Sequence, residues 1–173
     1  KKTKGGLPEA EARRIFKQVV DGVSYLHGND IAHRDIKLEN IVLDEAGTAR
    51  IVDFGAAREG GASAMTRSVQ GTPAYMAPEV CAGHAHKGAP ADMWALGVLV
   101  HTLLARGAFP YWGKDMAELK RNIATRDLSI PRGVSAPCAD LLRKLLDKSA
   151  ARRMSASELQ NHPWMRAAGG APV

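Results

Sequence analysis

The chain has 173 residues, of which 24 are Lys or Arg and 18 are Asp or Glu, so its formal net charge is +6. Hydrophobic residues make up 45% and charged residues 24%, a mixture typical of a globular domain that excludes a disordered or fibrous chain. Two cysteines, Cys81 and Cys138, are too few for a disulfide framework and favour a reducing compartment. The basic residues are scattered without interleaved aromatic side chains, which indicates a solvated surface and no nucleic-acid partner.

The sequence offers no signal for a membrane. Its first residues, KKTKGG, lack the apolar core of a signal peptide. The longest apolar run, residues 93–105, is too short to span a bilayer and is interrupted by His101 and Thr102. We therefore expect no membrane partner and a cytoplasmic location, with the nucleus as an alternative.

The first predicted element is a helix that follows a linker of residues 1–6. Leu7-Pro8-Glu9 is typical of a first helical turn, and Gly28-Asn29 is a stop signal. Between them the apolar residues recur at the spacing of one helical face, which predicts an amphipathic helix that packs on the core.

A small β-hairpin and a long loop are predicted next. Two apolar runs, residues 41–43 and 49–52, flank the turn residues Asp44-Glu45-Ala46-Gly47. Residues 53–91 are rich in Gly, Ala, Ser and Pro and lack periodicity. Because so long a loop is uncommon in a compact domain, it is expected to be functional.

The rest of the chain is predicted to be helical. Residues 93–105 are apolar on all sides, which predicts a helix buried in the middle of the fold. Two helices are expected near 115–124 and 136–146, and Ser155 begins a last one with the spacing of a capping box. The fold class is thus mainly α with one small hairpin, and a loose tail is expected after the domain.

Three motifs lie in and around the long loop. His33-Arg34-Asp35-Ile36-Lys37-Leu38-Glu39-Asn40 precedes the hairpin, Asp53-Phe54-Gly55 follows its second strand, and Ala77-Pro78-Glu79 comes later. In this order they resemble the catalytic loop, the metal-binding turn and the end of the activation segment (residues 53–79) of a eukaryotic protein kinase. The resemblance covers residues 7–165 and implies the fold of a kinase C-terminal lobe, with residues 166–173 as the tail.

The resemblance implies ATP and Mg²⁺ as cofactors and a role for each motif residue. Asp35 would accept or orient the proton of the attacking hydroxyl, and Lys37 would offset charge on the moving phosphoryl group. Asn40 and Asp53 would be the magnesium ligands. The implied nucleotide-binding residues are Lys37, Glu39, Asn40, Val42 and Asp53. The alternative, that Asp35 and Asp53 only cap turns, does not explain the full set of motifs.

The same comparison suggests the substrate class. Lys37, two residues after Asp35, resembles the lysine that kinases acting on Ser and Thr carry at this position. The segment of residues 71–79 also resembles the form found in those kinases. Thr72 in that segment is expected to hydrogen-bond Asp35 and Lys37. The implied partner is therefore a protein substrate with a Ser or Thr acceptor, and the subgroup most similar is the calmodulin-dependent and AMP-activated kinases.

Three further residues have implied structural roles. Asp92 is expected to tie down the backbone of the catalytic loop, and Arg153 is expected to form a buried ion pair with Glu79. His162-Pro163-Trp164 resembles the usual end of the domain.

Regulation by phosphorylation is implied by Arg34, which directly precedes Asp35. Ser68 lies where such kinases often carry the acceptor, Thr66 is nearby, and Arg58 could join Arg34 as a phosphate ligand. An upstream activating kinase would then be a partner. The alternative is that Ser68 is only a solvated loop serine.

Two features bear on specificity and metal binding. Glu39 is an acid that kinases favouring basic substrates use, but the second such acid is replaced by Thr102, so a basic preference is not predicted. Cys81, His84 and His86 could suggest zinc, but without a fourth ligand nearby the residues are interpreted as a surface loop.

The chain has no Gly-rich phosphate loop and no Val-Ala-x-Lys strand, the parts that form a kinase N-terminal lobe. We expect a fragment of a complete serine/threonine kinase that, by itself, transfers phosphate barely at all. The alternative is a truncated, kinase-like binding or scaffold module without catalysis.

Overall fold

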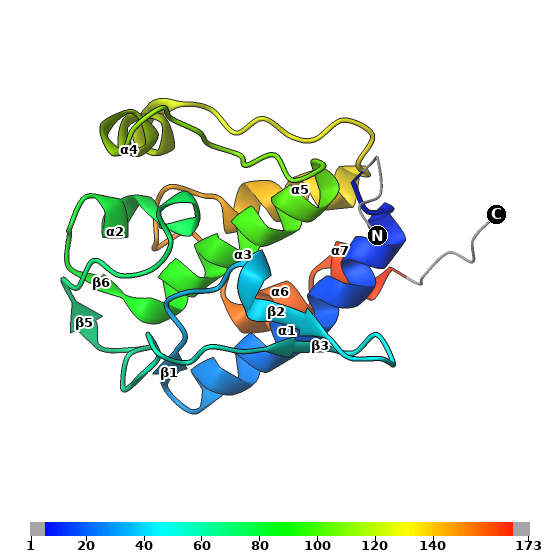
Figure 1. Ribbon diagram of the computed structural model, residues 1–173, viewed down its shortest axis with the longest axis horizontal. Helices are drawn as coiled ribbons and strands as arrows, with labels where there is room; N and C mark the ends of the chain where they lie inside the picture. The colour runs from blue at the N-terminus through cyan, green and yellow to red at the C-terminus, as the bar shows by residue number, and fades with distance from the viewer. Residues whose placement is uncertain (1–5, 168–173) are drawn as a thin grey trace.

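Two helices form the centre of the protein. In the computed structural model, which describes residues 6–167, α1 (Glu9–Gly28) packs beside α3 (Gly88–Leu104), and the remaining helices surround this pair (Figure 1). The mainly helical fold class predicted from the sequence is confirmed. Predictions for residues 1–5 of the linker and 168–173 of the tail lie outside the described residues.

The two central helices form for different reasons. α1 begins after Pro8, carries Glu9 and Glu11 near its positive end and buries one apolar face, as predicted. α3 is buried on nearly all sides. It begins five residues before the predicted start at Met93 and contains Pro90 in its first turn. Backbone amides in the first turn have no partner within the helix, so a proline there costs no helical hydrogen bond.

The predicted hairpin is present. β2 (Ile41–Leu43) pairs antiparallel with β3 (Ala49–Ile51), with Ile41 opposite Ile51. Oδ1 of Asp44 accepts the amides of Ala46 and Thr48, which closes the turn. Gln18 Oε1 on α1 accepts the amide of Ala49 at 2.8 Å, so the hairpin is fastened to the central helix.

The long loop predicted over 53–91 contains short elements, which corrects the expectation. β4 (Arg58–Glu59) pairs with β1 (Ile31–Ala32), and β5 (Met65–Thr66) pairs with β6 (His86–Lys87). The segment also includes η2 (Pro73–Tyr75), α2 (Pro78–Cys81) and the first turn of α3. Strands of two residues are too short to leave a periodic pattern in the sequence.

The C-terminal helices follow the predicted boundaries closely. They are α4 (Met116–Thr125), α5 (Ala136–Leu145) and α6 (Ala156–Gln160), and the additional short α7 (Pro163–Arg166) was not predicted. The side chain of Ser155 accepts a hydrogen bond from the amide of Glu158, and the side chain of Glu158 accepts one from the amide of Ser155. The predicted capping box is therefore confirmed. None of the helices within residues 6–167 combines the length and apolar character that a bilayer span requires.

Candidate active site

The catalytic-loop motif is held by one buried carboxylate on α3. Asp92 accepts the backbone amides of His33 at 2.9 Å and Arg34 at 2.8 Å, and a ring nitrogen of His27 lies 2.9 Å away. Arg34 adopts a left-handed backbone conformation with φ +65°, which is uncommon without glycine. The predicted anchoring of this loop by Asp92 is therefore present.

His33 orders the loop from within, a contribution that the sequence analysis did not assign. The residue is fully buried, and its Nδ1 accepts the amide of Asp35 at 3.3 Å. The proton of the neutral ring therefore lies on Nε2, which faces the carbonyl oxygen of Val52 at 3.3 Å. The ring also packs edge-to-face on Phe54. His33 thus joins the catalytic loop to the segment that contains Asp53.

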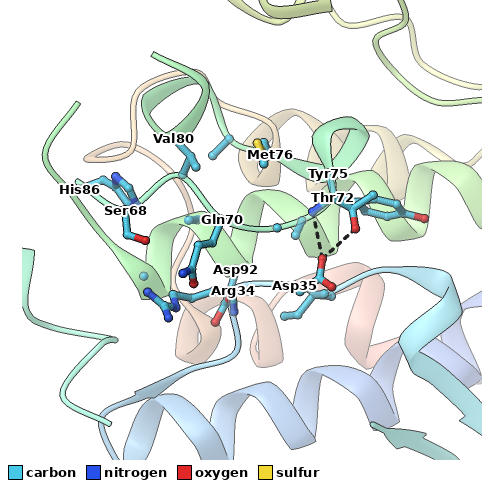
Figure 2. A pocket seen from close by; sticks show the side chains of 16 residues that line it. Arg34, Asp35, Ser68, Gln70, Thr72, Tyr75, Met76, Val80, His86 and Asp92 are labelled. Atoms are coloured by element: carbon cyan, nitrogen blue, oxygen red, sulfur yellow. Dashed lines mark hydrogen bonds between the residues drawn. The ribbon is translucent and has the colours of Figure 1, made fainter. Parts of the chain in front are cut away.

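Asp35, Lys37 and Thr72 form a compact hydrogen-bonded cluster, the geometry predicted for Thr72. Lys37 Nζ donates to Asp35 Oδ2 at 2.6 Å and to Thr72 Oγ1 at 3.0 Å. Thr72 donates its hydroxyl at 2.8 Å and its amide at 3.0 Å to Asp35 Oδ1, the two dashed contacts in Figure 2. The cluster joins the catalytic loop to the C-terminal part of the activation segment.

The hydrogen bonds of this cluster keep both Asp35 and Lys37 ionised. Partial burial alone would raise the pKa of Asp35, but the hydrogen bonds from Lys37 and Thr72 outweigh it and lower the pKa below its ordinary value. The hydrogen bond to Asp35 raises the pKa of Lys37, and the charges of Glu39 and Asp53 add to this effect. At neutral pH the site therefore contains a carboxylate acceptor beside an ammonium group.

Gly71 allows the two segments to approach. Its φ is +105°, and a Cβ atom added there would lie 2.7 Å from the carbonyl oxygen of Arg34. No other residue fits without moving the backbone. The glycine therefore sets the position of Thr72 over Asp35.

Asn40 and Asp53 supply oxygen atoms of the type that Mg²⁺ prefers. Asn40 is buried at the end of η1 (Leu38–Asn40), and its Nδ2 donates to the carbonyl oxygen of Asp35 at 2.9 Å, so its own side-chain carbonyl lies on the opposite side. Asp53, with φ +62°, exposes its carboxylate. The amide of Val52 donates to the carbonyl of Asn40 at 2.9 Å, which ties the two segments together. These residues fit a magnesium ion that also binds phosphate oxygens.

The other two residues implied for nucleotide binding lie at the surface beside these groups. Glu39 is exposed in η1, and Val42 is 43% exposed on β2. Phe54 and Leu43 are each 50% exposed. Val42 is thus an exposed apolar side chain on the hairpin.

Ser68 and Arg34 line the same small cavity, which has a volume of about 30 Å³ and extends to Asp35 and Thr72 (Figure 2). Thr66 lies on β5, and its Oγ1 accepts the amide of Ser68 at 3.1 Å. Burial and the charge of Arg58 lower the pKa of Arg34, and the charge of Asp92 opposes them. Ser68 and Arg34 thus share one cavity, and Thr66 is hydrogen-bonded to Ser68.

The ion pair predicted between Glu79 and Arg153 is present and bidentate. Arg153 donates to Glu79 Oε1 at 2.7 Å and to Oε2 at 3.0 Å. Its guanidinium also donates to the carbonyl of Pro90 and lies over the ring of Trp94. This pair fastens the end of the activation segment to the helical core.

The surface loop predicted around Cys81, His84 and His86 is only partly correct. Cys81 is buried on α2, and His86 is buried where β6 pairs with β5. His86 Nδ1 lies 2.8 Å from the carbonyl oxygen of His84, which is exposed. Within residues 6–167, no group of three or more His, Cys, Asp or Glu side chains is arranged to hold a metal ion.

Tyr75 is a second contributor that sequence reasoning missed. Its hydroxyl accepts the amide of Leu38 at 3.3 Å, and its ring packs edge-to-face on Phe109. The residue is buried between the catalytic loop and the core. The sequence signal that could have identified Tyr75 is an aromatic residue within the segment 71–79.

Comparisons with known proteins identify the family of this chain. Residues 1–165 match the protein kinase domain family, and the chain belongs to this family. It is 40% identical over 167 residues to CBL-interacting protein kinase 4 of Oryza sativa subsp. japonica, covering 92% of this chain and 36% of the relative. It is 35% identical over 170 residues to CBL-interacting serine/threonine-protein kinase 17 of Arabidopsis thaliana, covering 95% and 38%.

A third relative comes from an animal. The chain is 36% identical over 162 residues to serine/threonine-protein kinase kin-29 of Caenorhabditis elegans, covering 94% of this chain and 20% of the relative. The names of these relatives support the serine/threonine branch of the family. The chain spans at most about two fifths of the length of these three relatives.

Proposed function

We propose that this chain is the catalytic lobe of a serine/threonine protein kinase, which transfers the γ-phosphoryl group of ATP to a Ser or Thr hydroxyl of a protein. The observation that supports this most directly is the cluster of Asp35, Lys37 and Thr72 beside Asn40 and Asp53. Phosphoryl transfer requires alignment and charge neutralisation more than covalent catalysis, and this cluster supplies both.

Asp35 orients the attacking hydroxyl and accepts its proton. The carboxylate is ionised because Lys37 and Thr72 lower its pKa, so it accepts a hydrogen bond from the substrate. A carboxylate of low basicity takes the proton only when the bond to phosphorus is forming and the hydroxyl has become acidic. Thr72 holds one carboxylate oxygen with two hydrogen bonds, which keeps the group aimed while the substrate binds.

Lys37 and the two magnesium ligands neutralise the transferred group. The ammonium of Lys37 lies 2.6 Å from Asp35, so it is within reach of a phosphoryl group that approaches the bound hydroxyl. Mg²⁺, when bound, would supply positive charge that offsets the charge of the ATP phosphates. Asn40 and Asp53 would hold it, with Glu39 and Val42 beside the ribose and the adenine ring.

Activation by an upstream kinase is part of the proposal. Ser68, with Thr66 as the second acceptor, lines the same cavity as Arg34. A phosphate there adds up to about two negative charges, which would offset the repulsion between Arg34 and Arg58.

The experiment uses the natural polypeptide that contains this chain. Labelled γ-phosphate is offered with peptides that carry a single Ser, Thr or Tyr, and we expect label on Ser or Thr and not on Tyr. Asp53→Asn should abolish magnesium-dependent transfer, whereas Asp44→Asn, in the hairpin turn, should not. Absence of transfer to every peptide and protein substrate, with intact folding, would favour a binding or scaffold module instead.

A further inference from the structure

One turn of the activation segment is attached to two other parts of the lobe. Residues 60–64 form this turn, in which the amide of Ala64 donates to the carbonyl of Gly60 at 3.1 Å. On one side, the amides of Gly88 and Ala89 at the start of α3 donate to the carbonyls of Gly61 and Ala62 at 3.0 and 3.3 Å. A Cβ at position 88 would lie 2.5 Å from the Gly61 carbonyl, so this contact is as close as backbones allow.

On the other side, the turn is attached to Asp30 by three hydrogen bonds, one of which runs from the amide of Ala62 to the Asp30 carbonyl at 3.5 Å. Asp30 Oδ1 accepts the amide of Ser63 at 2.9 Å, and Asp30 Oδ2 accepts the hydroxyl of Ser63 at 3.0 Å. Asp30 has a left-handed backbone with φ +55° and directly precedes β1, the strand that pairs with β4 of the segment. Ser63 is exposed to solvent. The Asp30–Ser63 pair is thus an accessible contact at the base of the β1–β4 pairing.

We propose that Ser63 is an inhibitory phosphorylation site and that its phosphate detaches the turn from Asp30. The reaction is transfer from ATP by a protein kinase: Ser63 Oγ loses its proton, bonds to the γ-phosphorus, and ADP leaves. The product replaces a hydroxyl donor with a group that carries about −1.5 to −2 charges and only accepts hydrogen bonds at neutral pH. Asp30 then faces a like charge where it had a donor.

The surrounding charges favour this outcome. Glu59, opposite Ile31 in the β1–β4 pair, adds a second negative charge to the same region. Arg58 on β4, opposite Ala32, is the basic residue of this strand pair and is exposed. Arg67 lies beyond the turn and is exposed. A phosphate on Ser63 would repel the Asp30 carboxylate, which in the unmodified chain accepts two hydrogen bonds from Ser63.

The consequence for regulation rests on the proposed function. Loss of the attachment would loosen β4 and therefore the position of Arg58, one of the two arginines proposed to bind a phosphate on Ser68. Phosphates at Ser63 and Ser68 would then have opposite effects on the same segment. The attachment itself is a property of the folded chain and can be measured without any kinase assay.

The test measures hydrogen exchange at the amides of Ser63, Gly88 and Ala89 in the folded chain with phosphoserine incorporated at position 63. We expect exchange roughly tenfold faster or more than in the unmodified protein. The Asp30→Asn variant carrying the same phosphoserine should be protected again, since Asn tolerates the left-handed backbone and its amide can donate to the phosphate. Ser63→Ala should loosen the turn less than the phosphate, and Ser157→Asp, which adds charge on α6, should leave these amides unchanged.

Three results would overturn the proposal. Unchanged or slower exchange with phosphoserine would mean that Arg58 or Arg67 captures the phosphate and strengthens the turn. Equal loosening with and without the Asp30 carboxylate would mean that charge repulsion is not the cause. Phosphopeptide mapping of the protein from the cells that produce it should find Ser63 phosphate, and its consistent absence where the peptide is detected would reject the site. Neither exchange result depends on catalysis, so the proposed function could fail while this inference holds.

Discussion

Thr72 and Asp35 are joined by two hydrogen bonds to a single oxygen atom, one from the hydroxyl at 2.8 Å and one from the backbone amide at 3.0 Å. The residues are 37 positions apart in the chain, so the contact exists only when the activation segment is folded over the catalytic loop. The orientation of Asp35 is therefore coupled to the conformation of that segment.

Removing the Thr72 hydroxyl should slow catalysis without unfolding the protein. In the natural polypeptide, Thr72→Val loses the hydroxyl bonds to Asp35 and Lys37 but keeps the amide bond to Asp35. We expect kcat to fall by roughly tenfold to a hundredfold, the effect of losing one or two positioning hydrogen bonds. Thr72→Ser keeps the hydroxyl and should retain most of the rate. Equal rates for the Val and Ser variants in a steady-state peptide assay would contradict a positioning role.

Gly71→Ala tests the close approach of the two segments. The added methyl group would lie 2.7 Å from the Arg34 carbonyl in a backbone with φ +105°, and we expect a loss of about 1–3 kcal/mol in the free energy of unfolding. Gly133→Ala is the matched control, since Gly133 also has positive φ, +79°, but nothing lies within 4 Å of its added Cβ. Denaturant unfolding should show a larger loss for Gly71→Ala, and an equal loss would exclude the collision.

Arg153→Met should be strongly destabilising. The variant leaves Glu79 without its partner in a site where the Arg153 side chain has no solvent exposure, and breaking a buried pair typically costs about 3–5 kcal/mol. Arg152→Met removes a pair with Asp147 whose arginine side chain is 72% exposed, so its cost should be at most about 1 kcal/mol. Thermal or denaturant unfolding of both variants compares them directly, and similar losses would refute the structural role of Arg153.

His101 should make stability depend on pH. Burial lowers the pKa of this residue, and the carbonyls of Ser129 and Ala108 oppose the shift only in part. Because the unfolded chain then binds the proton at a higher pH than the folded chain, the full stability is present above about pH 6.5 and is lost as the pH falls toward the folded pKa.

The comparison of variants isolates this group. His101→Gln should reduce the loss of unfolding free energy between pH 7.5 and 5.5, and the exposed His84→Gln should not. Unfolding midpoints measured at a series of pH values provide the slope. An identical slope in wild type and His101→Gln would show that other groups control the acid response.

Much of the fold was predictable because its helices are long or well capped. The amphipathic spacing of α1 and the capping box at Ser155 are local signals, and both are present in the structure. The short strands β4, β5 and β6 were not predictable. A strand of two residues is too short to show a periodic pattern in the sequence. The pairing of these strands is fixed by tertiary contacts such as those of Gly88 with the turn at Gly61.

Part of the candidate site was likewise predictable from the sequence and part was not. Asp35, Lys37 and Asn40 are close in sequence and form a recognisable motif, and the contacts of Thr72, Asp92 and Arg153 followed from the family resemblance. The bonds of His33 to Asp35 and Val52 and of Asp30 to Ser63 depend on backbone geometry at particular positions. No local pattern in the sequence predicts these hydrogen bonds, so they were found only in the structure.

The most direct test of the proposed function is the rate of phosphoryl transfer by the natural polypeptide when Asp35 is replaced by Asn. The side chain keeps its size but loses the charge that receives the proton and pairs with Lys37. We predict that kcat falls by about a hundredfold or more with the KM for ATP nearly unchanged, since general-base groups contribute about 10²–10⁴-fold. A kcat within a few fold of wild type would contradict the assignment of Asp35 and the catalytic site built around it.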